Sequence, residues 1–297
     1  MGHPHRKVHL PAPEIGSLAL VDIVRYTVLA YGKEESVELS GADLALAVVV
    51  TGQATVLAYL HSPRLKALVY ALPLPFTAAT LTLGNAPDAT HICGLAALLL
   101  YIWLARFLYV HLHLPVVGAV ALSALAYLVA GWLVGRSVPP GDMAFAATAA
   151  PLLCFAVLLL ICLPPREEPG YRTSLPPWVK LPLTTGIVLL LLATKQVLRG
   201  FVATFPYVGV FAVYEARHSL WTLARQMPVF IVAAVPMMTL IRLTTPRLGL
   251  PGALTAGWVA FLFVLSALYH TRLVRTPRND ASEVPSKAQE RKVGDDA

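Results

Sequence analysis

The chain has 297 residues, of which 57% are hydrophobic and only 13% are charged, and its mean hydropathy is +0.67. A soluble domain usually carries about 25% charged residues, so the composition excludes a soluble globular protein and predicts an integral membrane protein. No segment alternates between polar and apolar residues, which argues against a β-barrel and leaves a helical bundle. The fold class that we predict is an all-α, polytopic membrane protein.

The formal net charge is +7. The basic residues lie in loops between apolar runs, which fits positive-inside topology and anionic headgroups. We therefore expect the lipid bilayer as a partner and no nucleic acid. The three cysteines form no CxxC pair, and we expect no metal at them and no cofactor elsewhere.

Taken in chain order, residues 1–42 predict a polar tail followed by an interfacial helix. The apolar runs that follow predict about nine spanning or re-entrant helices, at 43–60, 66–84, 91–111, 115–135, 143–163, 181–196, 199–215, 219–242 and 250–270. We divide them into a first four-helix repeat (43–135), a linker helix with a polar loop (136–180) and a second four-helix repeat (181–270). Residues 271–297 predict a charged, disordered tail.

The repeats are suggested by two apolar stretches that share markers in the same order. In both, a base is followed seven residues later by a proline, and an acid-Ala-x-His segment comes further on. These markers are Lys66, Pro73 and Asp88–His91 in the first stretch, and Arg199, Pro206 and Glu215–His218 in the second. An internal duplication with an odd helix between its halves would invert the second copy, as in many secondary transporters.

Charges beside proline-bent apolar segments favour a functional site. The candidate solute-binding residues are Lys66, Pro73, Asp88, His91, Arg106, Arg199, Pro206, Glu215, Arg217 and His218. At helical spacing, Glu215 and His218 would share one face and could pass a proton or hold a cation. The alternative for the acid and imidazole pairs is an ordinary loop at headgroup level, and for the bases it is snorkelling to the interface.

Arg106 lies deep in the apolar run LAALLLYIWLARFLYVHL. A bare arginine in lipid is costly, so its guanidinium group must pair with an acid or face water. Asp88 lies too far along the same helix to reach it. We therefore expect Glu215 to be its partner if the two repeats face each other.

Residues 180–270 also resemble the GlpM-like family of small inner-membrane proteins. The resemblance rests on Ala203-Thr204-Phe205-Pro206 and on the segment Tyr214-Glu215-Ala216-Arg217-His218-Ser219-Leu220. This chain departs from the family in its Tyr-Glu-Ala-Arg-His sequence and in being about twice as long. The resemblance implies four helices in this half and no particular activity.

The prediction for function is a multi-pass transporter or permease in the inner (cell) membrane, with a cytoplasmic C-terminus. It would move a small anionic solute or a lipid-phosphate group. The alternative is a non-catalytic accessory or scaffold protein, and a homodimer is an open possibility. We expect no enzyme and no catalytic residue, because the chain carries no recognisable nucleophile or metal motif.

Overall fold

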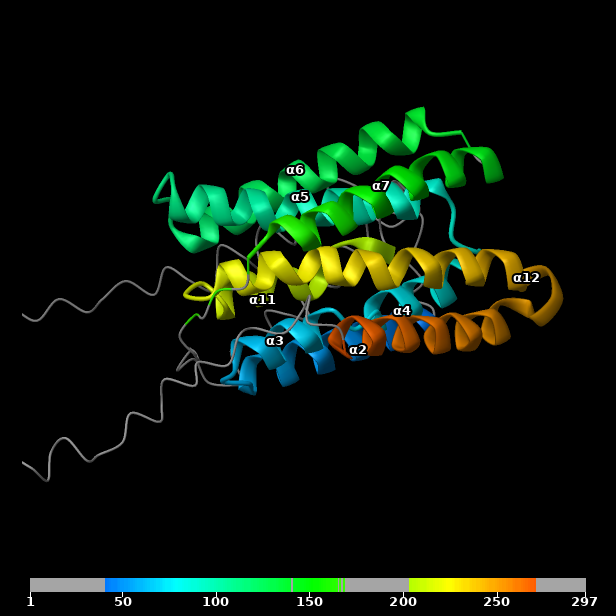
Figure 1. Cartoon of the computed structure of the whole chain (residues 1–297), viewed down its shortest axis with the longest axis horizontal. Coiled ribbons are helices and arrows are strands. Elements are labelled where there is room, and N and C mark those ends of the chain that lie inside the picture. Colours follow the sequence, from blue (N-terminus) through cyan, green and yellow to red (C-terminus); the bar gives the residue numbers. More distant parts are fainter. Residues whose placement is uncertain (1–40, 140, 165, 167, 169–202, 271–297) are drawn as a thin grey trace, which may run out of the picture. The chain divides into compact units, whose positions relative to one another are not determined.

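The computed structural model describes residues 41–139, 141–164, 166, 168 and 203–270. Within these residues all the regular secondary structure is helical, joined by short turns and loops (Figure 1). The helices are α2 (Gly41–Tyr59), α3 (Pro63–Tyr70), α4 (Leu74–Leu83), α5 (Ala89–Val110), α6 (Val116–Ser137), α7 (Asp142–Cys162), α11 (Tyr207–Glu215) and α12 (Leu220–His270).

Five segments of the described chain are long and apolar enough to cross a membrane: Pro63–Leu83, Ala89–Val110, Val116–Ser137, Asp142–Cys162 and Leu220–His270. Helix α2 contributes a shorter apolar stretch, Val48–Tyr59. A bilayer needs about 20 helical residues for one crossing. The prediction of an α-helical membrane protein is therefore confirmed.

Helix α12 has 51 residues, more than twice the length that one crossing needs. Gly249 interrupts it with φ 65° and ψ 170°, a left-handed conformation that glycine adopts without a Cβ clash. The two segments fold back on each other (Figure 1). Phe230 packs edge-on against Phe261 at 6.2 Å between ring centroids, and the Tyr269 hydroxyl donates to the Gln226 side chain at 3.4 Å. The sequence correctly placed a break between 242 and 250.

Helices α6 and α7 both pack against α5 on one side of the bundle, and the first segment of α12 packs against α5 and α7 (Figure 1). The second segment of α12 reaches α4, where the Trp258 indole N–H donates to the Thr77 hydroxyl at 2.9 Å. The short helix α11 contacts α2, α3, α5 and α6. Its buried residues place it inside the bundle rather than at the lipid-facing surface.

The predicted bounds of the described spans agree with the helices to within a few residues at most ends. The run at 66–84 differs, because it forms two helices, α3 and α4, separated at Ala71–Pro73. The described part of the run at 199–215 differs too, because it is interrupted at Phe205–Pro206 and α11 begins only at Tyr207. Helix α3 starts earlier than expected, with Pro63 in its first turn, where a missing backbone N–H costs nothing. The predicted span at 181–196 and the segments 1–40 and 271–297 lie outside the described residues.

Candidate functional site

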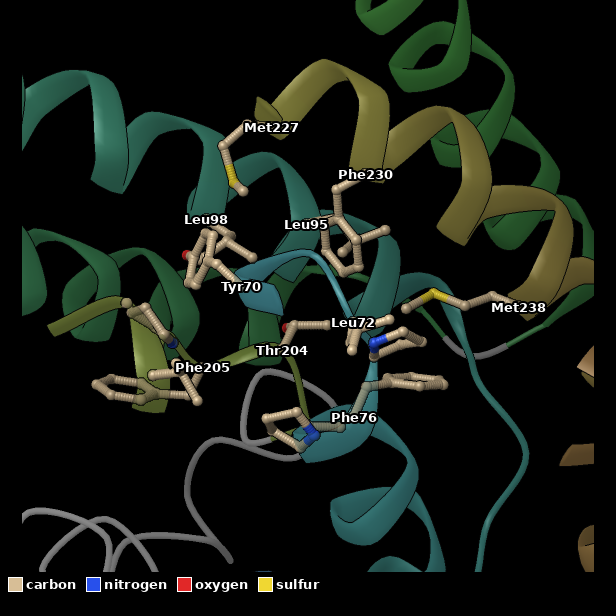
Figure 2. A pocket seen from close by; sticks show the side chains of 16 residues that line it. Tyr70, Leu72, Phe76, Leu95, Leu98, Thr204, Phe205, Met227, Phe230 and Met238 are labelled. Atoms are coloured by element: carbon tan, nitrogen blue, oxygen red, sulfur yellow. The ribbon is translucent and has the colours of Figure 1, made fainter. Parts of the chain in front are cut away.

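A cavity of about 40 Å³ lies inside the bundle, lined by residues of α3, α4, α5, α11 and the first segment of α12. Figure 2 shows Tyr70, Phe76, Leu98, Thr204 and Phe230 around it. Most of the lining is apolar and none of it carries a charge. The volume would accommodate a water molecule or a solute of a few atoms.

Both proline-containing breaks border this cavity. Pro73 precedes α4 with φ −80° and ψ 36°, and Pro206 precedes α11 with φ −73° and ψ 53°. The carbonyl of each proline accepts the first bond of the following helix, from Thr77 and Val210 respectively, at 3.0 Å. The two prolines thus occupy equivalent positions, at the start of short helices that begin beside one cavity.

The polar groups of the cavity are hydroxyls. The Thr204 hydroxyl lies 3.0 Å from that of Tyr127, and both residues are buried. Tyr70 is only 8% exposed, and among the described residues its hydroxyl has no hydrogen-bond partner. A Cβ added to Gly209 would lie 2.9 Å from that hydroxyl, so glycine lets α11 pass close to Tyr70.

Two of the predicted site residues form a buried pair close to these breaks. The Lys66 ammonium group donates to the main-chain carbonyl of Glu215 at 3.0 Å and lies 3.9 Å from its carboxylate. Both side chains are 2% exposed. Neither lines the cavity. The pair fastens the first turn of α3 to the end of α11, which are 149 residues apart in sequence.

Asp88 and His91 also meet, but as a helix cap. The Asp88 carboxylate accepts from the backbone N–H of Thr90 and of His91, and the His91 ring contacts both the carboxylate and the backbone N–H of Asp88. Burial alone would raise the pKa of Asp88, but hydrogen bonds from His91 and Thr90 hold this pKa well below its usual range. The sequence predicts either a binding site or an ordinary loop for these two residues, and the structure shows a capping box at the start of α5.

The prediction that Glu215 pairs with Arg106 is wrong. Glu215 pairs with Lys66, and the Arg106 guanidinium group instead lies over two tryptophans, 4.9 Å from the ring centre of Trp221 and 5.8 Å from that of Trp103. Arg106 does not line the cavity. A guanidinium group can be stabilised by cation–π contact with an aromatic face. The sequence alone does not show which aromatic side chains lie near Arg106.

The expectation that Glu215 and His218 share a helix face is also wrong, because α11 ends at Glu215 and the chain turns at Ala216–His218. Glu215 is buried and His218 is exposed. Arg217 folds back, with its side chain donating to the carbonyl of Tyr214 at 3.3 Å. Arg199 lies outside the described residues.

The candidate set therefore divides into groups with different roles. Pro73 and Pro206 border the cavity, Lys66 and Glu215 lock two segments together, and Asp88 and His91 cap α5. Sequence reasoning missed Tyr70, whose hydroxyl is the unpartnered polar group of the cavity, because a tyrosine in an apolar run gives no signal. The sequence singles out Thr204 only as part of the Ala203–Pro206 segment that resembles the GlpM-like family.

Comparisons with protein-family models, with curated proteins and with solved structures find no match to this chain.

Proposed function

We propose that this protein is a multi-pass membrane transporter or permease for a small anionic solute, which binds in the cavity between Pro73 and Pro206. The single observation that carries the proposal is that two interrupted helices meet at one cavity. Non-helical backbone at membrane depth is tolerated where it is buried in protein or lines a cavity. Interrupted helices that meet near the bilayer midplane are a common plan for solute sites in secondary transporters.

The chemistry of the cavity favours an acceptor of hydrogen bonds. Helices α4 and α11 both begin beside it, and the start of a helix carries a partial positive charge of about half a unit. The buried Tyr70 hydroxyl is available to donate. Together these groups suit a small anion better than a cation. Lys66, which the sequence suggested for this role, is engaged with Glu215.

The proposed architecture has nine helices in two inverted repeats. It is supported by the equivalent positions of Pro73 and Pro206 and by the contact between Lys66 and Glu215. That contact places the start of the first interrupted segment against the end of the second, as two oppositely directed copies would. The implied GlpM-like unit of four helices would then be the duplicated element.

The test is solute flux into liposomes that contain the purified full-length protein. Chloride, nitrate and formate serve as small anions, and glycerol serves as the neutral comparison. We expect anion flux above that of protein-free liposomes, and a severalfold loss of it in Tyr70→Phe. Tyr101→Phe is the matched control, because it removes a buried, unpartnered hydroxyl that does not belong to the cavity lining.

Glycerol flux as large as anion flux would contradict the preference for anions. An equal loss in both tyrosine variants would remove Tyr70 from the site. If all four solutes cross no faster than through protein-free liposomes, the alternative of a non-catalytic accessory protein is favoured.

A further inference from the structure

A second basic site lies away from the cavity, around Trp221 in the first turn of α12. The guanidinium carbon of Arg166 is 4.3 Å from the centre of the Trp221 ring, and that of Arg106 is 4.9 Å from it. Trp103 packs edge-on against Trp221 at 5.8 Å. Helix α5 and the segment after α7 therefore each bring one cation to the same aromatic side chain, which lies at the start of α12.

These two cations have no ion pair with an acid within the described residues. Glu167 and Glu168 follow Arg166 in the sequence, and Glu167 lies outside the described residues. Glu168 uses its carboxylate to cap α12, where it accepts from the backbone N–H of Trp221 at 3.1 Å and of Thr222 at 2.6 Å. Two like charges held beside one ring repel each other. An anion that contacts both would relieve this repulsion, and guanidinium groups match the geometry of phosphate oxygens.

The surroundings of the cluster fit a lipid. Arg106 lies in the last two turns of α5, Arg166 follows the end of α7, and Trp221 opens α12. Helices α5 and α7 thus end, and α12 begins, close to this cluster. Next to the cluster, α5 exposes Phe107 (49%) and the last turn of α7 exposes Ile161 (64%). Arginine and tryptophan above exposed apolar side chains are typical of the headgroup level of a bilayer.

We infer that Arg106 and Arg166 bind the phosphate group of an anionic phospholipid, whose acyl chains lie along the exposed faces of α5 and α7. Trp221 holds the two guanidinium groups in place through cation–π contacts. The site is separate from the cavity and does not depend on transport. It gives Arg106, which is costly to bury in lipid without a partner, a defined role at the membrane surface.

The test uses full-length protein in neutral detergent micelles, titrated with phosphatidylglycerol that carries bromine on its acyl chains. Bromine quenches nearby tryptophan fluorescence. Phosphatidylcholine with the same brominated chains is the zwitterionic comparison. We expect the wild-type protein to be quenched by phosphatidylglycerol at a mole fraction about tenfold lower than by phosphatidylcholine. Arg106→Gln/Arg166→Gln should remove most of this difference.

Arg136→Gln is the matched control. Arg136 also stacks on a tryptophan, with its guanidinium carbon 4.1 Å from the centre of the Trp132 ring. It lies in the last turn of α6, away from the cluster around Trp221. This variant should keep the preference for phosphatidylglycerol. An equal loss in Arg136→Gln would overturn the assignment to Arg106 and Arg166.

Two outcomes in the wild-type protein would also overturn the proposal. One is equal quenching by the two lipids. The other is loss of phosphatidylglycerol quenching when inorganic phosphate is added at equal concentration, which would make free phosphate the ligand. If the double variant does not fold, Arg166→Gln alone changes an exposed side chain and should still weaken the preference severalfold; an unchanged preference would contradict the inference.

Discussion

The ammonium group of Lys66 and the backbone carbonyl of Glu215 lie 3.0 Å apart in the interior of the bundle, and the two side chains are each 2% exposed. Removing two charges from water is costly, and their attraction compensates only when the geometry is good. The pair joins the first interrupted segment to the second. It therefore fixes how the two breaks at Pro73 and Pro206 meet at the cavity.

Lys66→Met should lower the free energy of unfolding by about 3–5 kcal/mol, because it removes the Lys66 cation from beside the buried Glu215 carboxylate. The double variant Lys66→Met/Glu215→Gln should recover at least half of this loss, since neither charge then remains. Thermal unfolding in detergent measures both changes. Arg217→Gln, at the same end of α11 but less buried, is the control and should cost less than about 1 kcal/mol. A double variant no more stable than Lys66→Met would show that the pair is not energetically coupled.

Gly94→Ala should destabilise the protein by about 1–3 kcal/mol, because a Cβ there would overlap the Thr204 hydroxyl and come within 3.3 Å of the Tyr127 hydroxyl. Gly52→Ala is the control, since a Cβ at this exposed helical position meets nothing within 4 Å. It should stabilise α2 by about 0.5–1 kcal/mol. The unfolding temperatures of the two variants should therefore move in opposite directions. Similar shifts in both would contradict the close packing of α5 against the segment at Thr204.

Asp88→Ala should cost about 0.5–2 kcal/mol, because it removes the cap of α5, whereas Asp88→Asn should keep most of the cap. The pKa of Asp88 is lowered in the folded protein. The stabilisation by the carboxylate is therefore fully present above its ordinary pKa of about 4 and is lost as the pH falls below that value. The stability of the wild type should thus fall toward that of Asp88→Asn on acidification from about pH 6 to about pH 3. A gap between them that does not change with pH would contradict the lowered pKa.

Cysteines placed at Ser62 and Ser137 should be labelled from opposite sides of the membrane. Three spans lie between these positions: Pro63–Leu83, Ala89–Val110 and Val116–Ser137. The test uses a membrane-impermeant maleimide on intact and permeabilised cells, in a background with the three natural cysteines changed to alanine. A cysteine at the fully buried Ser123 is the control and should resist labelling. Labelling of both sites from one side would contradict the three crossings.

Much of the fold could be predicted from the lengths of the apolar runs and from the residues that begin and end helices. Helices α5, α6 and α7 begin and end within a few residues of the predicted spans, because Pro115, Gly141 and the capping residue Asp88 act locally. The break in α12 was predicted for the same reason, since Gly249 and Pro251 mark it in the sequence. The division of the run at 66–84 into two helices was not predicted, because prolines inside an apolar run are compatible with a bent helix as well as with a break.

The sequence by itself determined that this is a helical membrane protein, since its composition cannot cover a soluble surface, and it marked Lys66, Pro73, Pro206 and Glu215 as unusual for an apolar bundle. Only the tertiary structure decided which of these residues meet. Lys66 contacts Glu215, which lies 149 residues further along the chain. Arg106 packs against the rings of Trp103 and Trp221 and not against an acid. Charge pairing and stacking depend on which helices pack side by side and at what depth, and apolar surfaces that look alike in sequence do not encode that choice locally.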